Sequence, residues 1–158
     1  MAIHYLDGTV IGEKDCSTKA KSLPINGTLP ENLENAIREY GYDYESKRKG
    51  FDDDGIPSYD EDEFSEYLKN SVKQNESVII LSNDWAGHYT VVIGYDDMGT
   101  PETEDDVAII VDPFDTTDHT SDGYTICSYE RLYAQMEPEV FGIPDNNYEF
   151  IKVKRKSS

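Results

Sequence analysis

The sequence has few cysteines, few basic residues and no long hydrophobic run. Its two cysteines, Cys16 and Cys127, allow at most one disulfide and lack the spacing of a metal site. Neither a disulfide framework nor a thiolate metal centre is therefore expected. A reduced intracellular setting and unpaired thiols outside the cell both agree with this cysteine content.

Basic residues are outnumbered, because 14 Lys and Arg stand against 33 Asp and Glu, for a net charge of −19. Without a basic track for phosphates, nucleic-acid binding is not expected, and an anionic membrane surface is disfavoured. An acidic protein can attract cationic peptides, although strong acidity more often serves solubility.

Membrane insertion and targeting signals are not expected either. No apolar run approaches the length that spans a bilayer. Residues 1–6 are too short for the apolar core of a signal peptide and lack a basic leader. The sequence does not decide the cellular location of the protein, which is cytoplasmic, or exported if a leader precedes Met1.

What is present indicates one folded domain over residues 1–158. The apolar share of 37% is low, but 12 Tyr and 5 Phe offset it, since aromatic side chains bury large areas. Residues 50–63 are mostly Asp, Glu, Gly, Pro and Ser, and this composition predicts an exposed acidic loop.

Hydrophobic spacing changes from helical to alternating along the chain. Helices are predicted over residues 1–6, 13–22, 30–40, 61–73 and 129–136. Strands are predicted over residues 42–45, 78–81, 89–95, 107–111 and 148–154. Thr28-Leu29-Pro30-Glu31 matches a capping box for the third helix. Helices followed by an antiparallel sheet make an α+β domain.

One pair of strands carries a chemical signal. His88 stands at the mouth of strand 89–95, and strand 107–111 ends in Asp112-Pro113. If the two strands form an antiparallel hairpin, the start of one lies beside the end of the other, which makes His88 and Asp112 neighbours. An Asp beside a His can fix its tautomer, as the base of a nucleophilic triad requires. Each motif alone is commonplace in structural roles, whereas the pair favours function.

The same residues resemble a known family. Residues 88–96, His-Tyr-Thr-Val-Val-Ile-Gly-Tyr-Asp, followed by a strand ending in Asp-Pro, resemble the double-glycine leader peptidases, papain-like cysteine peptidases of the bacteriocin-processing type. Residues 11–21 and 26–33 resemble its second helix, its Gly-Thr turn and its third helix. Residues 126–136 resemble its short helix after the Asp-Pro strand. The resemblance covers about residues 1–136.

The resemblance implies a papain-like fold and hydrolysis of a peptide or protein substrate through a thiol acyl-enzyme. It makes His88 the general base and Asp112 its orienting partner, and it implies no cofactor and no metal. The family's nucleophilic Cys opens the first helix before Gly-Pro, with a Gln shortly upstream. Residues 1–8 resemble the later part of that helix, which puts the nucleophile roughly one to two turns before Met1.

Other residues are weaker candidates. Cys16 could replace the nucleophile, but it lies in the second-helix segment and Asp15 would raise its thiol pKa. Cys127 falls at a position that the family does not use. Trp85 could line a substrate cleft or simply pack. His119 lies in an acidic loop that could hold a cation but matches no calcium loop, and His4 reads as a core-edge histidine.

The expected function is therefore a cysteine-peptidase-like domain with little activity as the 158-residue chain. The alternative is a non-catalytic module that binds a peptide or partner protein in a retained cleft. An acidic decoy is a third possibility, which rests on the charge of −19 alone. The oligomeric state, substrate and pathway are not determined by the sequence.

Overall fold

The computed structural model describes residues 1–24, 27–49, 60–82, 87–115, 120, 122–136 and 148–156. The helices are α1 (Ala2–Asp7), α2 (Glu13–Lys19), α3 (Pro30–Glu39), α4 (Glu61–Lys73) and α5 (Tyr129–Gln135). The strands are β1 (Asp43–Lys49), β2 (Ser77–Ser82), β3 (His88–Asp96), β4 (Val107–Val111), β5 (Tyr124–Ser128) and β6 (Tyr148–Lys154). None of these helices is long and apolar enough to cross a bilayer.

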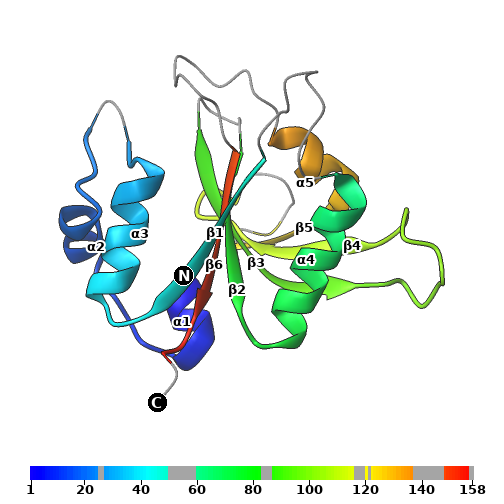
Figure 1. Cartoon of the computed structure of the whole chain (residues 1–158), viewed down its shortest axis with the longest axis horizontal. Coiled ribbons are helices and arrows are strands. Elements are labelled where there is room, and N and C mark those ends of the chain that lie inside the picture. The colour runs from blue at the N-terminus through cyan, green and yellow to red at the C-terminus, as the bar shows by residue number, and fades with distance from the viewer. Residues whose placement is uncertain are drawn as a thin grey trace.

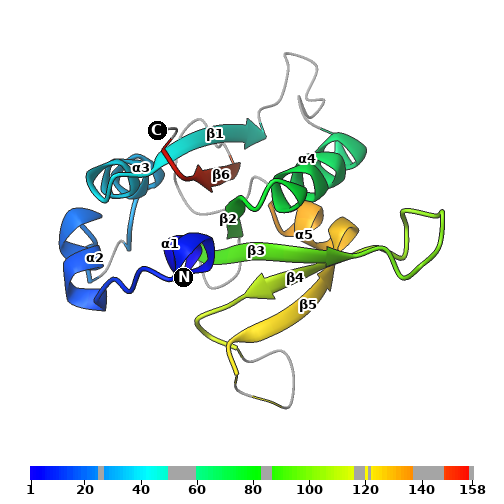
Figure 2. The same ribbon diagram turned by 90° about the horizontal axis from the view of Figure 1, so that it is seen from below.

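The strands form one antiparallel sheet in the order β1-β6-β2-β3-β4-β5. The helices lie on its two sides, with α1, α2 and α3 on one and α4 and α5 on the other (Figures 1 and 2). The α+β class and the antiparallel sheet predicted from the sequence are confirmed. The last strand, β6, lies in the interior of the sheet between β1 and β2, and Phe150, Ile151 and Val153 are accordingly buried.

Alternation along the strands builds a core on each face of the sheet. Val78 and Ile80 of β2 pack against Phe64 and Leu68 of α4 on one face. Between them in sequence, Ile79 points to the opposite face. There it joins a second cluster whose other buried members are Ala2, Ile3, Leu6, Ile37, Tyr42, Val91, Ile151 and Val153.

Helix ends follow local chemistry, and the start of α3 differs from expectation. Leu29, not Thr28, is the N-cap of α3, and no side chain caps this helix. The predicted capping box is wrong because the Thr28 hydroxyl instead shares a 2.5 Å hydrogen bond with the Ser22 hydroxyl. A capping box does begin α4, where Asp60 and Glu63 bond each other's main-chain amides.

The predicted acidic loop therefore ends earlier than expected. Residues 61–63 form the first turn of α4, and residues 50–59 lie outside the described part of the chain. Three acidic residues in a first turn suit a helix because its N-terminal amides carry partial positive charge.

A strand was missed at residues 124–128, part of which was expected to be helical. The strand β5 pairs with β4 over residues that the family resemblance had included in the helix, whereas α5 begins at Tyr129 as the sequence pattern predicts, and the Ser128 side chain accepts a bond from the Arg131 amide. Likewise β1 extends to Lys49, beyond the predicted residue 45, because it pairs with β6 along its whole length. In both cases, pairing with a neighbouring strand of the sheet overrides weak local preference.

Candidate active site

The β3–β4 hairpin brings His88 and Asp112 to one face of the sheet. Val91 lies opposite Val111, so Asp112 falls opposite Thr90 as β4 ends. Side chains two residues apart share a face, which makes His88 the diagonal neighbour of Asp112. Gly87 turns the chain into β3 with a φ of 112°, a conformation that a residue with a Cβ adopts only with strain.

The two side chains are in direct contact. The Nε2 atom of His88 lies 2.7 Å from Oδ1 of Asp112, and the side chains are only 9% and 12% exposed. The main-chain amide of Phe114 donates to the same oxygen at 2.8 Å. Hydrogen bonds of this kind to a carboxylate are short and strong, so Asp112 is held in place from two sides.

This contact determines the chemistry that the imidazole can perform. An ionised carboxylate only accepts hydrogen bonds, so Nε2 of His88 must carry the proton in its bond to Asp112. In neutral imidazole the lone pair then lies on Nδ1. His88 is thus oriented as a base through Nδ1, in the manner that an Asp partner provides in nucleophilic triads.

Phe114 is a further member of the site that sequence reasoning missed. Its ring meets the His88 ring edge to face, with centroids 5.2 Å apart and planes at 66°, while the residue stays 59% exposed. An exposed aromatic two residues after the acidic partner was the available signal. It shields one side of the imidazole from water and presents an apolar surface beside it.

Neither thiol of the chain is placed at this site. Cys127 pairs with Ala108, which pairs with Tyr95 seven residues along β3 from His88. Because a strand rises by about 3.3 Å per residue, the side chains of Cys127 and His88 are separated by roughly 20 Å. The position of Cys127 therefore excludes it as the partner of His88.

Cys16 lies on α2, which packs against α3 at the edge of the molecule (Figures 1 and 2). The Tyr40 hydroxyl fixes this contact by donating to Asp15 at 2.6 Å. Burial raises the pKa of the Cys16 thiol, and the Asp15 carboxylate adds to this effect. A raised pKa disfavours the thiolate that a nucleophile needs, so Cys16 has the properties of a structural thiol.

The remaining sequence candidates add no side chain to the site. Trp85 and His119 lie outside the described residues. His4 is exposed on α1, so its interpretation as a core-edge histidine is wrong. Residues 2, 3 and 6 supply the buried face of this short helix instead. Among the described residues, no three His, Cys, Asp or Glu side chains are grouped to hold a metal.

Comparison with known proteins locates the fold. The structure is similar to the crystal structure of the peptidase domain of Streptococcus ComA, a bifunctional ABC transporter involved in a quorum-sensing pathway. The TM-score is 0.57 at 19% sequence identity, and the match covers 98% of this chain and 85% of that one. The chain therefore has a papain-like peptidase fold of the type found in that transporter domain. No family model and no curated protein matches the sequence.

Proposed function

We propose that this chain is a cysteine-peptidase-like domain in which His88 is the general base and Asp112 is its orienting residue. The observation that carries the proposal is the 2.7 Å bond from Nε2 of His88 to Asp112, which leaves Nδ1 as the basic nitrogen. The peptidase fold of the similar domain agrees with this role. A peptide or protein is the corresponding substrate.

In such a reaction the imidazole would take the proton from a thiol as the sulfur forms a bond to the scissile carbonyl carbon. It would then return the proton to the amine as the carbon–nitrogen bond breaks, and water would later release the acyl group. Neither Cys16 nor Cys127 is placed to supply that thiol. We therefore expect little or no peptidase activity from the 158-residue chain.

A cleavage assay tests this expectation. Quenched fluorescent peptides are incubated with the unmodified chain and with the variants Cys16→Ala, Cys127→Ala and His88→Ala. We expect background signal from all four proteins. Cleavage that is lost in Cys16→Ala and His88→Ala but retained in the matched Cys127→Ala control would make Cys16 the nucleophile and overturn the expectation.

Thiol alkylation provides a second measurement that does not need the right substrate. A histidine that activates a thiol accelerates its reaction with iodoacetamide near neutral pH. Because neither thiol is placed at His88, we expect both cysteines to react at the same rates before and after His88→Gln. A His88-dependent rate at either cysteine would contradict this assignment.

The alternative function is a non-catalytic module that binds a peptide beside His88. The positions of the two thiols favour it, as does Phe114, an exposed aromatic surface next to the imidazole. Binding of an uncleaved peptide that weakens in Phe114→Ala but not in the distant Tyr5→Ala would support this module. Unchanged binding in both variants would exclude the His88 surface as its site.

A further inference from the structure

The two edges of the sheet differ in how they are protected. Edge strands attract further strands unless charges or other devices block them. At the β1 edge, Glu45 forms ion pairs with Lys47 and Lys152. At the other edge, β5 has the sequence Tyr-Thr-Ile-Cys-Ser and contains no charged residue.

The ladder shows which main-chain groups of β5 face outward. The Asp112 amide donates to the Gly123 carbonyl at 3.0 Å, which makes these residues a hydrogen-bonded pair. Such pairs alternate along an antiparallel ladder, so Thr125 and Cys127 bond to β4 while Ile126 points its amide and carbonyl away from it. Both hydrogen-bonding groups at the centre of the strand are thus directed toward an added strand.

The side chains beside this edge form an apolar surface. Ile126 is 69% exposed and Tyr124 is 52% exposed. Ile126 lies opposite Ile109 of β4. The Ile109 side chain packs closely on Gly94 of β3, where an added Cβ would lie only 3.0 Å from it. The helices on this side of the sheet make their main contacts elsewhere, α1 with β2, β3 and β6 and α3 with β1 and β6, while α2 packs on α3. Exposed apolar groups of this kind mark interaction surfaces.

Acidic side chains flank both ends of the strand. Asp122 precedes β5 and is exposed, and its carboxylate accepts from the Tyr124 amide. At the other end Ser128 pairs with Val107, next to the turn between β3 and β4. This turn, residues 96–106, is named the acidic hairpin here because it has no Lys or Arg and five exposed carboxylates: Asp96, Asp97, Glu102, Glu104 and Asp105.

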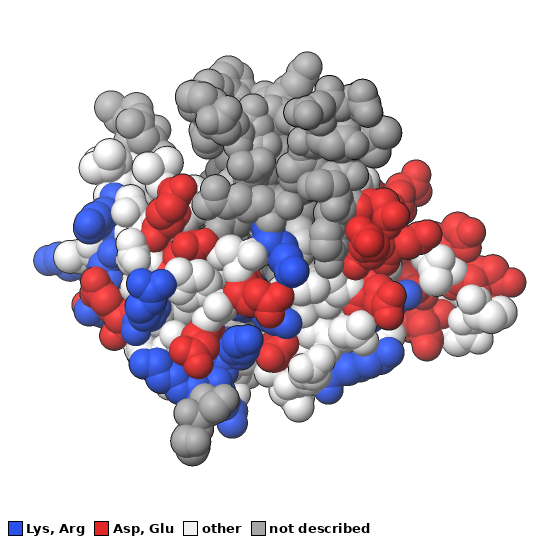
Figure 3. All heavy atoms as spheres, viewed as in Figure 1, with Lys and Arg blue, Asp and Glu red and all other residues white. Residues whose placement is uncertain are grey.

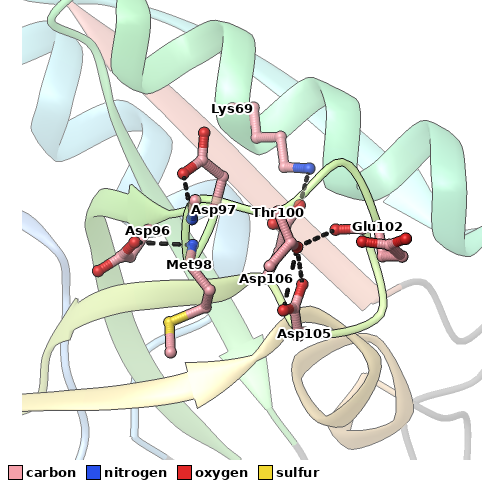
Figure 4. Close-up of polar contacts among 9 residues, drawn as sticks. Lys69, Asp96, Asp97, Met98, Thr100, Glu102, Asp105 and Asp106 are labelled. Atoms are coloured by element: carbon pink, nitrogen blue, oxygen red, sulfur yellow. Dashed lines mark hydrogen bonds and ion pairs between the residues drawn. The ribbon is translucent and has the colours of Figure 1, made fainter.

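The acidic hairpin is fixed in place. The Thr100 hydroxyl donates to the Asp105 carboxylate at 2.8 Å, and Lys69 of α4 forms an ion pair with Asp106 at the hairpin base (Figure 4). Figure 3 shows acidic side chains gathered over this end of the molecule and the start of α4. Asp105 and Asp106, which lead into β4 beside the end of β5, are therefore each held by a side-chain contact.

We propose that the β5 edge binds an extended peptide that carries β-branched apolar side chains flanked by Lys or Arg. The peptide adds as a strand antiparallel to β5, bonds to the main chain of Ile126 and covers its side chain. Its basic ends meet Asp122 and the acidic hairpin. Charge selects this occupant over a second copy of the chain, because two chains of net charge −19 repel each other. The proposal does not depend on the catalytic role of His88, since it concerns binding without cleavage.

Fluorescence anisotropy with a labelled heptapeptide, Arg-Lys-Val-Ile-Val-Lys-Arg, tests the proposal on the full chain. Ile126→Lys places a charge at the centre of the edge, and we expect it to weaken binding by about tenfold or more. Val10→Lys is the matched control, because Val10 is 82% exposed and distant in the fold, and it should bind as the unmodified chain does. Equal binding by the two variants would overturn the proposal.

N-methylated peptides test the strand geometry without altering the protein. One version carries methyl groups on alternate amides, and a second carries them on the other amides. Because only one set faces β5, we expect one version to lose binding and the other to keep it. Loss in both versions, or in neither, would exclude strand addition.

Charge and self-association complete the test. Glu104→Gln should weaken binding and reduce its dependence on salt, whereas Glu13→Gln, on the distant α2, should not. Equal effects of the two substitutions would overturn the assigned location of the basic ends of the peptide.

Sedimentation velocity then tests whether a second copy of the chain occupies the β5 edge instead of a peptide. A dimer that Ile126→Lys converts to a monomer would assign the edge to a second copy and refute the peptide proposal.

Discussion

Two aspartates bracket β4, and their surroundings are opposite in character. Asp106 comes directly before the strand and Asp112 directly after it. The first is 2% exposed and forms an ion pair with Lys69, whose ammonium group also lies 5.4 Å from the Tyr129 ring. The second bonds to His88 beside an exposed aromatic ring. One residue type therefore serves a structural pair at one end of β4 and a candidate catalytic pair at the other.

The difference lies in the partner and in access to solvent. The Lys69 side chain forms an ion pair with Asp106, and this contact links α4 to the base of the acidic hairpin. Burial, with the Asp106 charge beside it, raises the pKa of Tyr129, as expected for a closed pocket. The imidazole of His88 can accept and donate protons through its ring nitrogens, so of the two pairs only His88–Asp112 contains a group suited to proton transfer.

The largest expected effect comes from breaking the buried pair. Asp106→Ala leaves the Lys69 ammonium group, whose side chain is 17% exposed, without the buried carboxylate that pairs with it, and we expect a loss of about 3 kcal/mol of unfolding free energy. Urea unfolding followed by circular dichroism measures it. Glu104→Ala is the control on the exposed part of the acidic hairpin, with an expected change within about 0.5 kcal/mol.

A double variant distinguishes an unpaired charge from lost packing. Lys69→Met with Asp106→Leu removes both charges and keeps an apolar filling, so most of the stability lost in Asp106→Ala should return. A double variant that is as unstable as Asp106→Ala would show that packing, and not the uncompensated ammonium group, causes the loss.

The fold was predictable where local signals and tertiary pairing agree. The strand at residues 107–111 and the strand at residues 148–154 were predicted with the bounds that the structure has, because both alternate or are uniformly apolar. The strand β5 was not, since an edge strand buries little and its sequence lacks a strong apolar pattern. The mixture of charges in β1 hides its extent until its pairing with β6 is known.

The candidate site was predictable in part for a related reason. His88 and Asp112 stand at strand ends, so a simple hairpin argument brings them together. Asp106 has an equivalent place at the other end of β4, but its partner Lys69 lies on a helix 37 positions away in sequence. Packing of a helix on a sheet decides that contact, and no spacing rule in the sequence reveals it.

An intermediate loss of unfolding free energy is expected at Asp112, at the end of β4 opposite to Asp106. Asp112→Ala removes the acceptor shared by His88 and the Phe114 amide, and we expect a loss of about 1–3 kcal/mol, less than for Asp106→Ala. Nitrogen-15 NMR of the imidazole gives a readout that a merely structural role would not change. The proton should reside on Nε2 in the unmodified chain and lose this preference in the variant.

Asp112→Asn is the matched control for this measurement. The amide oxygen can still accept from Nε2 of His88 and from Phe114, so the Nε2–H tautomer should persist while the negative charge is gone. If the unmodified chain carries its neutral-state proton on Nδ1, the assignment of Nδ1 as the base is wrong.

The smallest effect on the unfolding free energy is expected at Asp7, an aspartate that is exposed at the surface, unlike Asp106 and Asp112. Hydrogen bonds from the Thr9 and Tyr42 hydroxyls and from the Thr9 amide lower the pKa of Asp7 from 3.8 to about 2. Because the pKa of Asp7 is lower in the folded chain than in the unfolded chain, its charge stabilises the fold at pH values above the unfolded-state pKa. That contribution is lost as pH falls from about 4 to about 2.

Asp7→Asn should therefore make the unfolding free energy less dependent on pH within this window. Urea unfolding at several acidic pH values measures the slope, with Glu104→Gln as the control. An unchanged slope in Asp7→Asn would show that Asp7 titrates alike in the folded and unfolded chain, contrary to its lowered pKa in the folded state.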